Sequence, residues 1–391
     1  MKLKTPTCLI ITTLTFWLLP HGFGLSITGE DLVKSAGNLL TGIGSQLVKN
    51  IPTVDEILYT SIQVLFGVPE QVVAKSLNEA CSLYLSSGNI LPRITPAAEE
   101  MYFQLRTPCN NISVPLLEAD QLVEHAEFDV QKKVVIFVSG WTTDINETDH
   151  IEDMAKAYHC QGDYNFLYVN TSNFVQTLYS WSAFNTEAVG TFIGEGLMKL
   201  TQEVPPANIH LVGHSLGAQM VGKAGRHFTS LTGESVARIT GLDPANPCFN
   251  EGESLSGIFR GDAAFVDIIH TNSGVLGIAE PVGDADFYPG GLGPIKSGCI
   301  QFGCSHSRAL EYYIESIYPW DQLNFMAKRC SSLRSLNSGR CDGPPTPMGF
   351  ASSTNLAGNY FLDVNSKSPF GKSTINNVNR KEVSHCGRCE N

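Results

Sequence analysis

Positive charge is scarce in this sequence of 391 residues. It contains 26 lysine and arginine residues against 38 aspartate and glutamate residues, which gives a formal net charge of −12 at pH 7. Nucleic acids and anionic membranes attract proteins through clusters of basic side chains. The acidic balance therefore argues against a nucleic-acid partner and against electrostatic docking on an anionic membrane.

A long apolar run is also missing, and beyond the N-terminal segment no stretch reaches the roughly 18 apolar residues that a membrane helix needs. At the N-terminus, Lys2 and Lys4 precede a short apolar run from Cys8 to Leu19, and small and turn-forming residues follow from Pro20 to Gly24. This order is typical of a signal peptide. We therefore predict a signal peptide over residues 1–24, no transmembrane segment, and a secreted, extracellular protein.

Cysteine, by contrast, is plentiful. Of the 11 cysteines, Cys8 lies in the predicted signal peptide, and the ten that remain are an even number suited to disulfides in an oxidising compartment. Most of their pairings cannot be deduced from spacing alone. Three acceptor motifs, at Asn111, Asn146 and Asn170, predict N-glycosylation, which agrees with export.

The segment from residue 25 to 105 differs from the rest of the chain. Its apolar residues recur at helical spacing, and we predict two to four helices, broken near Pro52 and Pro69. The simpler interpretation is a helical lead-in that packs on the main domain, since amphipathic periodicity usually means core contact. The alternative is a surface that binds lipid or a partner.

Strands and helices alternate from about residue 125 onward. Apolar strands that alternate with helices predict a mostly parallel sheet covered on both faces, which is the α/β class. We place this domain at residues 106–370, with a C-terminal tail at 371–391. The predicted strands are 134–138, 165–169, 209–212, 236–240 and 264–269, and the predicted helices are 149–159, 184–203, 216–229 and 306–317.

The pattern Gly213-His-Ser-Leu-Gly217 lies between a predicted strand and a predicted helix. The turn is sharp, so the positions two before and two after the serine must be small, and glycine occupies both. The free N–H groups at the start of the helix would stabilise negative charge beside Ser215. We therefore predict that Ser215 is the nucleophile of an α/β-hydrolase.

A serine hydroxyl needs a base to take its proton, and the base is usually a histidine that a carboxylate orients. In this fold the chain order is serine, acid, histidine. Asp243 follows the predicted strand that ends at Leu242, so it would share the carboxyl edge of the sheet with Ser215. His306 opens a predicted helix and is the favoured base, while His270, at the end of a strand, is the rival.

Five segments together resemble the pancreatic lipase family, and the resemblance covers about residues 105–370. It implies that Ser215 is the nucleophile, Asp243 the acid and His306 the base. The segments that carry the resemblance are Ile209–Ala218, Arg238–Phe249, Phe265–Thr271, Asp286–Gly291 and Cys304–Ala309.

The resemblance also implies an oxyanion hole made by the backbone N–H groups of Leu216 and Trp141. Two fixed donors of this kind stabilise the negative oxygen of a tetrahedral intermediate. Where the family has His-Gly-Phe, this chain has Ser139-Gly140-Trp141. Because the donor is a backbone group, we expect the hole to survive this change.

The family's lid lies between two cysteines just before the base. The resemblance places them at Cys299 and Cys304, a predicted disulfide, and the four residues between them cannot fold over the site as a flap. The neighbouring segment 270–286 is also short. Both features are similar to the family's A1 phospholipases, which cleave the first-position acyl ester. We therefore expect no dependence on colipase.

Three further comparisons with the family follow. About twenty residues remain after position 370, so we expect no counterpart of the family's C-terminal β-sandwich in this sequence. Two positions of its calcium loop correspond to Phe259 and Asp262, so we predict no metal site, and no cofactor is expected. Cys330 and Cys341 match a family disulfide.

The helical lead-in is similar to that of insect lipase-like proteins related to yolk proteins. Yolk proteins of that group resemble the fold but lack the working nucleophile, so the alternative function is a catalytically silent lipid-binding or storage protein. The presence of Ser215, Asp243 and His306 favours an enzyme. The predicted function is a secreted serine hydrolase that binds phospholipid or glyceride at an interface and releases fatty acid through an acyl-enzyme.

Overall fold

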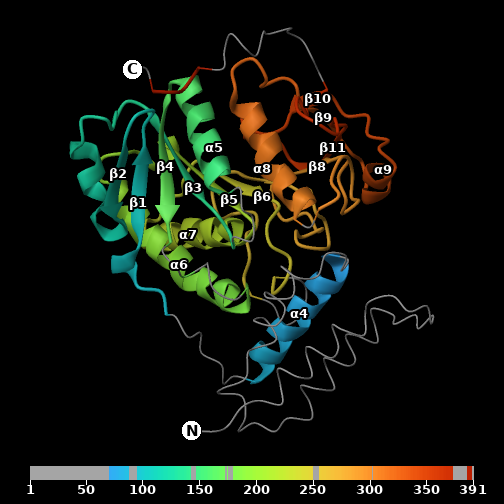
Figure 1. Cartoon of the computed structure of the whole chain (residues 1–391), viewed down its shortest axis with the longest axis horizontal. Coiled ribbons are helices and arrows are strands. Elements are labelled where there is room, and N and C mark those ends of the chain that lie inside the picture. Colours follow the sequence, from blue (N-terminus) through green and yellow to red (C-terminus); the bar gives the residue numbers. More distant parts are fainter. Residues whose placement is uncertain are drawn as a thin grey trace, which may run out of the picture. The chain divides into compact units, whose positions relative to one another are not determined.

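The computed structural model describes residues 70–87, 95–141, 147–171, 174, 179–249, 255–301, 303–372 and 385–389 (Figure 1). The helices of this part are α4 (Glu70–Ser87), α5 (Glu147–Gln161), α6 (Tyr179–Leu200), α7 (Leu216–Thr232), α8 (Cys304–Ile317) and α9 (Leu333–Asn337). Three 3-10 helices accompany them, η1 (Ala98–Glu100), η2 (Leu116–Glu124) and η3 (Pro206–Asn208). Among these described helices, none is both long and apolar enough to cross a membrane.

One sheet of eleven strands runs through the described residues, in the order β10-β9-β11-β8-β7-β6-β5-β3-β4-β1-β2. From β11 to β4 every neighbouring pair is parallel, and antiparallel strands extend the sheet at both edges. The strands are β1 (Tyr102–Arg106), β2 (Asn111–Pro115), β3 (Lys133–Val138), β4 (Tyr164–Asn170), β5 (Ile209–His214), β6 (Arg238–Leu242), β7 (Val266–Ile269), β8 (Ala285–Pro289), β9 (Met326–Arg329), β10 (Pro345–Pro347) and β11 (Gly358–Leu362).

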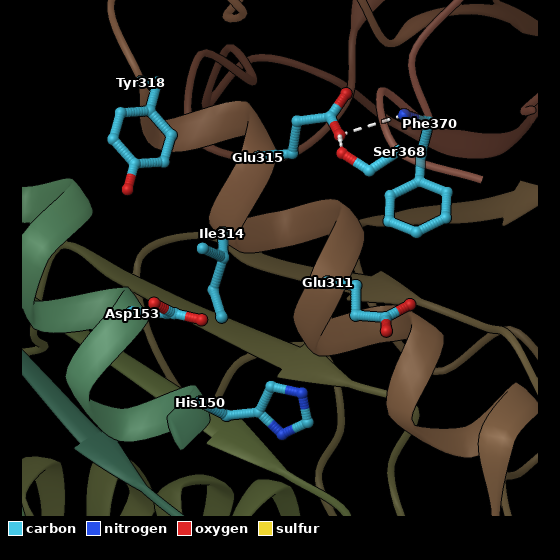
Figure 2. Close-up of a pocket in the computed structure, with 8 residues that line it drawn as sticks. All are labelled: His150, Asp153, Glu311, Ile314, Glu315, Tyr318, Ser368 and Phe370. Atoms are coloured by element: carbon cyan, nitrogen blue, oxygen red, sulfur yellow. Dashed lines mark hydrogen bonds between the residues drawn. The ribbon is translucent and has the colours of Figure 1, made fainter. Parts of the chain in front are cut away.

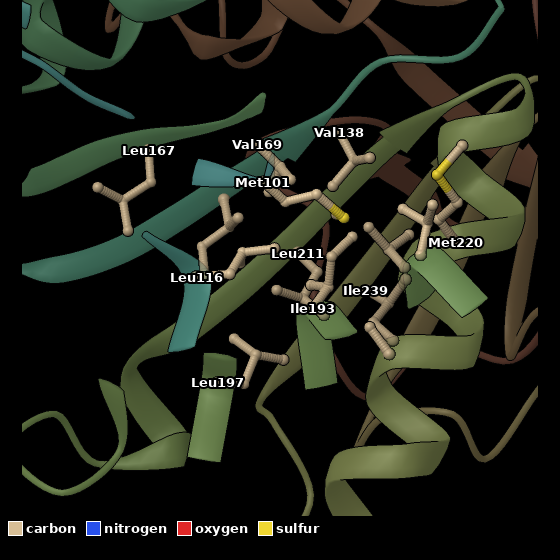
Figure 3. Packing of buried hydrophobic residues seen from close by; sticks show 14 of the residues in the cluster. Met101, Leu116, Val138, Leu167, Val169, Ile193, Leu197, Leu211, Met220 and Ile239 are labelled. Carbon is tan, nitrogen blue, oxygen red and sulfur yellow. The ribbon is translucent and has the colours of Figure 1, made fainter. Parts of the chain in front are cut away.

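Helices cover both faces of the sheet, as the predicted α/β class requires. Ile136 and Val138 of β3 join a core with residues of α6 and α7, part of which Figure 3 shows. Val135 and Phe137, which point to the opposite face, join a second core with α5 and α8. Successive strand residues alternate between faces, so a strand buried on both sides has an uninterrupted apolar sequence. Figure 1 shows the two helix pairs on either side of the strands.

The central elements predicted from periodicity are confirmed, with ends shifted by a few residues. Strand β8, which lies in the parallel part of the sheet between β7 and β11, was not predicted, and neither were β1, β2, β9, β10 and β11. The boundary placed at residue 105 is wrong, because it falls inside β1, which pairs with β4 and belongs to the main sheet. Of the helical lead-in, α4 begins directly after Pro69 as predicted. The predicted signal peptide and the helices expected before Pro69 lie outside the described residues.

Five disulfides join the described parts of the chain. The two pairings implied by the family resemblance, Cys299–Cys304 and Cys330–Cys341, are present. The structure also assigns the pairings that the sequence left open: Cys81–Cys248, Cys109–Cys389 and Cys160–Cys386. The two cysteines of the predicted tail are therefore tied to the turn between β1 and β2 and to α5.

Candidate active site

Ser215 stands at the junction between β5 and α7. Its backbone has φ 56° and ψ −123°, a left-handed conformation that a non-glycine residue rarely adopts. The Ser215 N–H donates to the Leu242 carbonyl at the end of β6 (3.0 Å), and its carbonyl accepts from Ala218 and Ala245 (3.1 Å each). Such strain persists only where surrounding contacts enforce it, and it clusters at functional sites.

The glycines on either side make this turn possible. A Cβ atom at Gly213 would lie 2.4 Å from the Gly217 carbonyl oxygen, and one at Gly217 would lie 2.1 Å from the Val138 carbonyl oxygen. Neither position can hold a larger residue without moving the backbone. The sequence prediction that both must be small is confirmed, and so is the predicted strand–turn–helix context.

Asp243 and His306 are brought together although 63 residues separate them. Asp243 follows β6 with φ 42°, and His306 lies in the first turn of α8. His306 Nδ1 lies 2.6 Å from Asp243 Oδ2. The carboxylate also accepts from the backbone N–H groups of Thr271 (2.6 Å) and Asn272 (3.0 and 3.1 Å). These two donors, which the sequence did not indicate, fix the buried carboxylate toward the imidazole.

Ser215 lies at the same edge of the sheet as this pair. The His214 ring, one residue before it, is 4.7 Å from the His306 ring between centroids. Burial, with a further contribution from His306, holds the pKa of His214 well below its usual range, so this neighbour stays neutral. Within the part of the chain that the structure describes, no hydrogen bond joins the Ser215 hydroxyl to His306. Catalytic hydrogen bonds of this kind are often long without substrate.

The segment that follows β3 runs beside the nucleophile. A Cβ atom at Gly140 would lie 2.7 Å from Ser215 Cβ and 2.9 Å from the Leu216 backbone nitrogen. The next residue is Trp141, whose ring packs edge-on against Tyr179 at 5.4 Å. Ser139 contacts the Tyr168 hydroxyl at 3.1 Å. The chain thus brings the backbone of 139–141 to the place where an oxyanion hole is needed.

His270, the rival base, is fully buried. Its Nδ1 lies 2.9 Å from the Ile278 carbonyl oxygen and its Nε2 lies 2.8 Å from Asp286 Oδ1. Its ring stacks on Tyr288 with centroids 4.3 Å apart. Because both ring nitrogens face oxygen acceptors, His270 has no free nitrogen to act as a base. The interpretation that it packs at a strand end agrees with this geometry.

Lys296 is a buried cation near Asp243. Its ammonium group donates to two backbone carbonyls of the preceding loop, at 2.8 and 2.7 Å. Burial lowers the pKa of Lys296 to about 8, and the nearby Asp243 carboxylate opposes part of that shift. The Lys296 N–H donates to the Ser305 hydroxyl (2.9 Å), which ties this loop to the helix that carries His306.

The loop between Cys299 and Cys304 is short and partly apolar. Its Ile300 side chain is 97% exposed, and Ile295 on the approach to the loop is 67% exposed. The disulfide that closes the loop lies directly before His306. Two exposed isoleucines therefore lie on this loop and on the segment that leads into it.

A cavity of about 270 Å³ lies between α5 and α8, and Ser215, Asp243 and His306 are not among the residues that line it (Figure 2). Its walls carry three carboxylates, and one of them, Glu315, accepts hydrogen bonds from Ser368 Oγ (3.3 Å) and the Phe370 N–H (2.9 Å). A carboxylate-lined cavity is unsuited to an acyl chain, because removing water from charged groups beside hydrocarbon is costly. The lining residues are His150, Asp153, Glu311, Ile314, Glu315, Tyr318, Ser368 and Phe370.

The positions that match the family's calcium loop hold an ion pair. Asp262 Oδ2 accepts from Arg226 Nη1 (2.7 Å) and from the Phe259 N–H (2.9 Å). Burial raises the pKa of Asp262 to about 6, against the lowering effect of these donors. No group of three or more histidine, cysteine, aspartate or glutamate side chains in the described ranges is arranged to hold a metal ion.

Sequence comparisons identify lipases and related proteins as similar to this chain. The family model described as Lipase matches residues 71–370. The chain is 36% identical over 230 residues to Vitellogenin-1 of Ceratitis capitata, which covers 58% of this chain and 52% of that protein. It is 30% identical over 273 residues to Pancreatic triacylglycerol lipase of Cavia porcellus, covering 63% of this chain and 57% of that protein. The chain thus spans about half the length of these curated relatives.

Among solved structures, a similar one is an α/β hydrolase enzyme, MGS-M1, from a Medee basin deep-sea metagenome library. The superposition has a TM-score of 0.26 and 11% sequence identity, and it covers 39% of this chain and 61% of that one. The fold assignment therefore stands on the sheet order and helix layers of this chain.

Proposed function

The chain belongs to the lipase family, and from that premise we propose that it is a serine hydrolase that cleaves carboxylic esters of lipids. The observation that carries the proposal is the pairing of Asp243 Oδ2 with His306 Nδ1 at 2.6 Å, at the same sheet edge as the strained Ser215. A carboxylate on Nδ1 leaves Nε2 as the nitrogen that takes a proton.

In the proposed mechanism, the Ser215 hydroxyl oxygen attacks the acyl carbon while His306 Nε2 takes the hydroxyl proton. Asp243 stabilises the imidazolium that forms. The imidazolium then gives its proton to the leaving alcohol, and an acyl-enzyme remains. A water molecule, deprotonated by His306, attacks that ester, and the fatty acid leaves as Ser215 recovers its proton.

The backbone N–H groups of Leu216 and Trp141 are the proposed donors to the oxyanion. Leu216 begins α7, so its N–H belongs to the positive end of a helix. Donors that are fixed before the reaction lower the energy of the transition state without reorganising. The close approach of Gly140 to Ser215 supports Trp141 as the second donor.

We propose a phospholipase A1 type of specificity, with glycerides as the competing substrate class. Only four residues lie between Cys299 and Cys304, so a bulky headgroup meets no long flap there. The exposed Ile295 and Ile300 offer apolar contact with a lipid interface. A net charge of −12 favours a neutral or zwitterionic surface over an anionic one. Colipase has no part in this proposal.

Secretion is proposed together with the enzyme function. The five disulfides fit an oxidising compartment. Of the three predicted glycosylation sites, Asn111 is exposed in β2 and Asn170 is half-buried at the end of β4, while Asn146 lies outside the described residues. Asn111 is therefore the site that we favour for a glycan.

The second candidate is a lipid-binding or storage protein without turnover, and the similarity to Vitellogenin-1 favours it. This candidate needs the fold but does not need a nucleophile. It gives no reason for a strained serine beside a paired carboxylate and imidazole, because strain costs stability unless a function uses it. The two candidates therefore differ in one measurable property, the reactivity of Ser215.

The test uses the full chain and its Ser215→Ala variant with a fluorophosphonate probe, which reacts with activated serines. We expect labelling of the wild type and none of the variant. Fatty acid release is then measured from phospholipid vesicles and from triglyceride emulsions, with more expected from the vesicles. No labelling of folded wild type would overturn the enzyme proposal in favour of the storage protein. Release from triglyceride alone would overturn the phospholipase assignment.

A further inference from the structure

Glu70, the first residue of α4, lies just before the segment that the lipase family model matches. Its carboxylate accepts a hydrogen bond from the Asn272 side chain (3.0 Å) and another from the Gly303 backbone N–H (2.7 Å). We propose that Glu70 is a positioning residue that fixes the relative placement of Asp243 and His306 from α4. This inference rests on the proposed hydrolase function.

On the acid side, Glu70 acts through Asn272. The backbone N–H of Asn272 donates to both oxygens of the Asp243 carboxylate. The Asn272 side chain is fully buried, and its amide nitrogen donates to Glu70 Oε2 and to the Pro294 carbonyl (2.8 Å). A residue that is held at its side chain presents its backbone N–H in one direction. Glu70 therefore helps to fix the donor that orients the acid.

On the base side, Glu70 acts through the start of α8. Gly303 is the N-cap of this helix, and it has no side chain to make a capping hydrogen bond. In a capping box, a glutamate three residues into the helix accepts from the N-cap N–H. In α8 that third position is His306 itself. The N-cap N–H therefore has no such carboxylate in its own helix, and Glu70 supplies one from α4.

The middle of α4 is fixed to the loop that follows Asp243. Cys81 forms a disulfide with Cys248, and the Asn78 side chain accepts from the Cys248 N–H at 3.0 Å. Between Glu70 and Asn78, the apolar side chains Val73, Ala74 and Leu77 are buried. A helix that is held along its face and by this disulfide presents Glu70 in a fixed position, which a positioning role requires.

The charge of Glu70 also suits the reaction. The N-terminal end of a helix carries partial positive charge, which disfavours a cation in its first turn. His306 lies in the first turn of α8, and the proposed mechanism makes it an imidazolium. The carboxylate of Glu70 at the Gly303 N–H offsets that unfavourable field. Loss of the charge is therefore expected to act on the chemical step more than on substrate binding.

The experiment compares Glu70→Gln with Glu79→Gln in the full chain. Glu79 is exposed on the same helix. This control therefore removes the same charge from α4 and leaves the hydrogen bonds of Glu70 to Asn272 and Gly303 intact. Activity on a water-soluble short-chain ester gives kcat and KM separately, and thermal unfolding reports folding. We expect kcat of Glu70→Gln to fall by about ten- to a hundredfold with KM within about twofold, because small misplacements of catalytic groups cost that much. The control is expected to match wild type.

Equal kcat values for Glu70→Gln and wild type would overturn the proposal, and so would a loss that the Glu79 control shares or that follows the folded fraction alone. If Glu70→Gln does not fold, Glu70→Asp carries the test. It keeps the charge but is too short to reach both partners, and a kcat equal to wild type would overturn the role. A wild type that does not react with fluorophosphonate contradicts the hydrolase function itself, and the positioning role then falls with it.

Discussion

Two histidine–carboxylate pairs stand near the carboxyl edge of the sheet, His306 with Asp243 and His270 with Asp286. In both, a ring nitrogen lies within 2.8 Å of a carboxylate oxygen. The His270 ring is fully buried, and the Ile278 carbonyl and the Asp286 carboxylate occupy its two nitrogens. The His306 side chain is 12% exposed and has one nitrogen on Asp243.

The two pairs differ in whether one imidazole nitrogen remains available to take a proton. The His270 pair joins β7 to β8 and to the loop at Ile278, and its ring is clamped by Tyr288. The His306 pair joins the loop after β6 to α8 and lies at the same sheet edge as the strained serine. The same two side-chain types thus serve as a brace in one place and as the proposed acid–base pair in the other, because only one ring keeps a free nitrogen.

The largest expected effect is on activity, and it is expected only when the His306 pair is broken. In His306→Gln the base is lost, and kcat for a soluble ester is expected to fall by roughly 10⁶-fold, as for other serine hydrolases without their histidine. Thermal stability is expected to fall less than in His270→Gln, because the His306 side chain is 12% exposed and the Asp243 carboxylate keeps the Thr271 and Asn272 N–H donors. Steady-state kinetics and a melting curve measure both. Activity within tenfold of wild type would remove His306 from the mechanism.

His270→Gln is expected to act on stability. Breaking this fully buried pair leaves the Asp286 carboxylate with only the Val282 and Gly283 backbone N–H donors, and the free energy of unfolding is expected to fall by about 3–5 kcal/mol. Urea denaturation measures this loss. Fluorophosphonate labelling of Ser215 per folded molecule is expected to remain. A variant of unchanged stability that has lost labelling would reverse the roles assigned to the two pairs.

The smallest effect tests how closely the Asp243 carboxylate is confined. A Cβ atom at Gly277 would lie 2.3 Å from Asp243 Oδ1, so Gly277→Ala must displace that carboxylate. We expect kcat to fall by about ten- to a hundredfold. The control is Gly293→Ala, where a Cβ atom meets nothing within 4 Å. Equal kinetics for the two variants would show that the carboxylate tolerates displacement.

Much of the central fold could be predicted from the sequence, for identifiable reasons. A strand that is buried on both faces has an uninterrupted apolar sequence, and β3, which is apolar from Val134 to Val138, can be recognised from its sequence alone. The edge strands are short, and their pattern is weaker: β10 consists of Pro345, Thr346 and Pro347. Nor could the boundary at residue 105 be placed correctly, because β1 is recognised as part of the sheet through its pairing with β4.

In the candidate site, too, some residues could be predicted from the sequence and others could not. Ser215 and its two glycines lie within five residues, and chain order then selects Asp243 and His306. The groups that hold them do not follow a local pattern. Asn272 acts through its backbone N–H, and Glu70 reaches Gly303 across 233 residues of chain. Contacts at such separations are set by tertiary packing, which no spacing rule encodes.

The pairing of the tail cysteines determines when during synthesis two of the disulfides can form. Cys386 and Cys389 emerge 226 and 280 residues after their partners, Cys160 and Cys109. On the proposed secretory route, both earlier thiols remain without their native partners throughout that interval, in a compartment where wrong disulfides can form. The native set of disulfides is completed by a segment made after the sheet and its helices, so a chain that stops before it carries two unpaired thiols. On that route, quality control that recognises free thiols would distinguish such a chain from the finished protein.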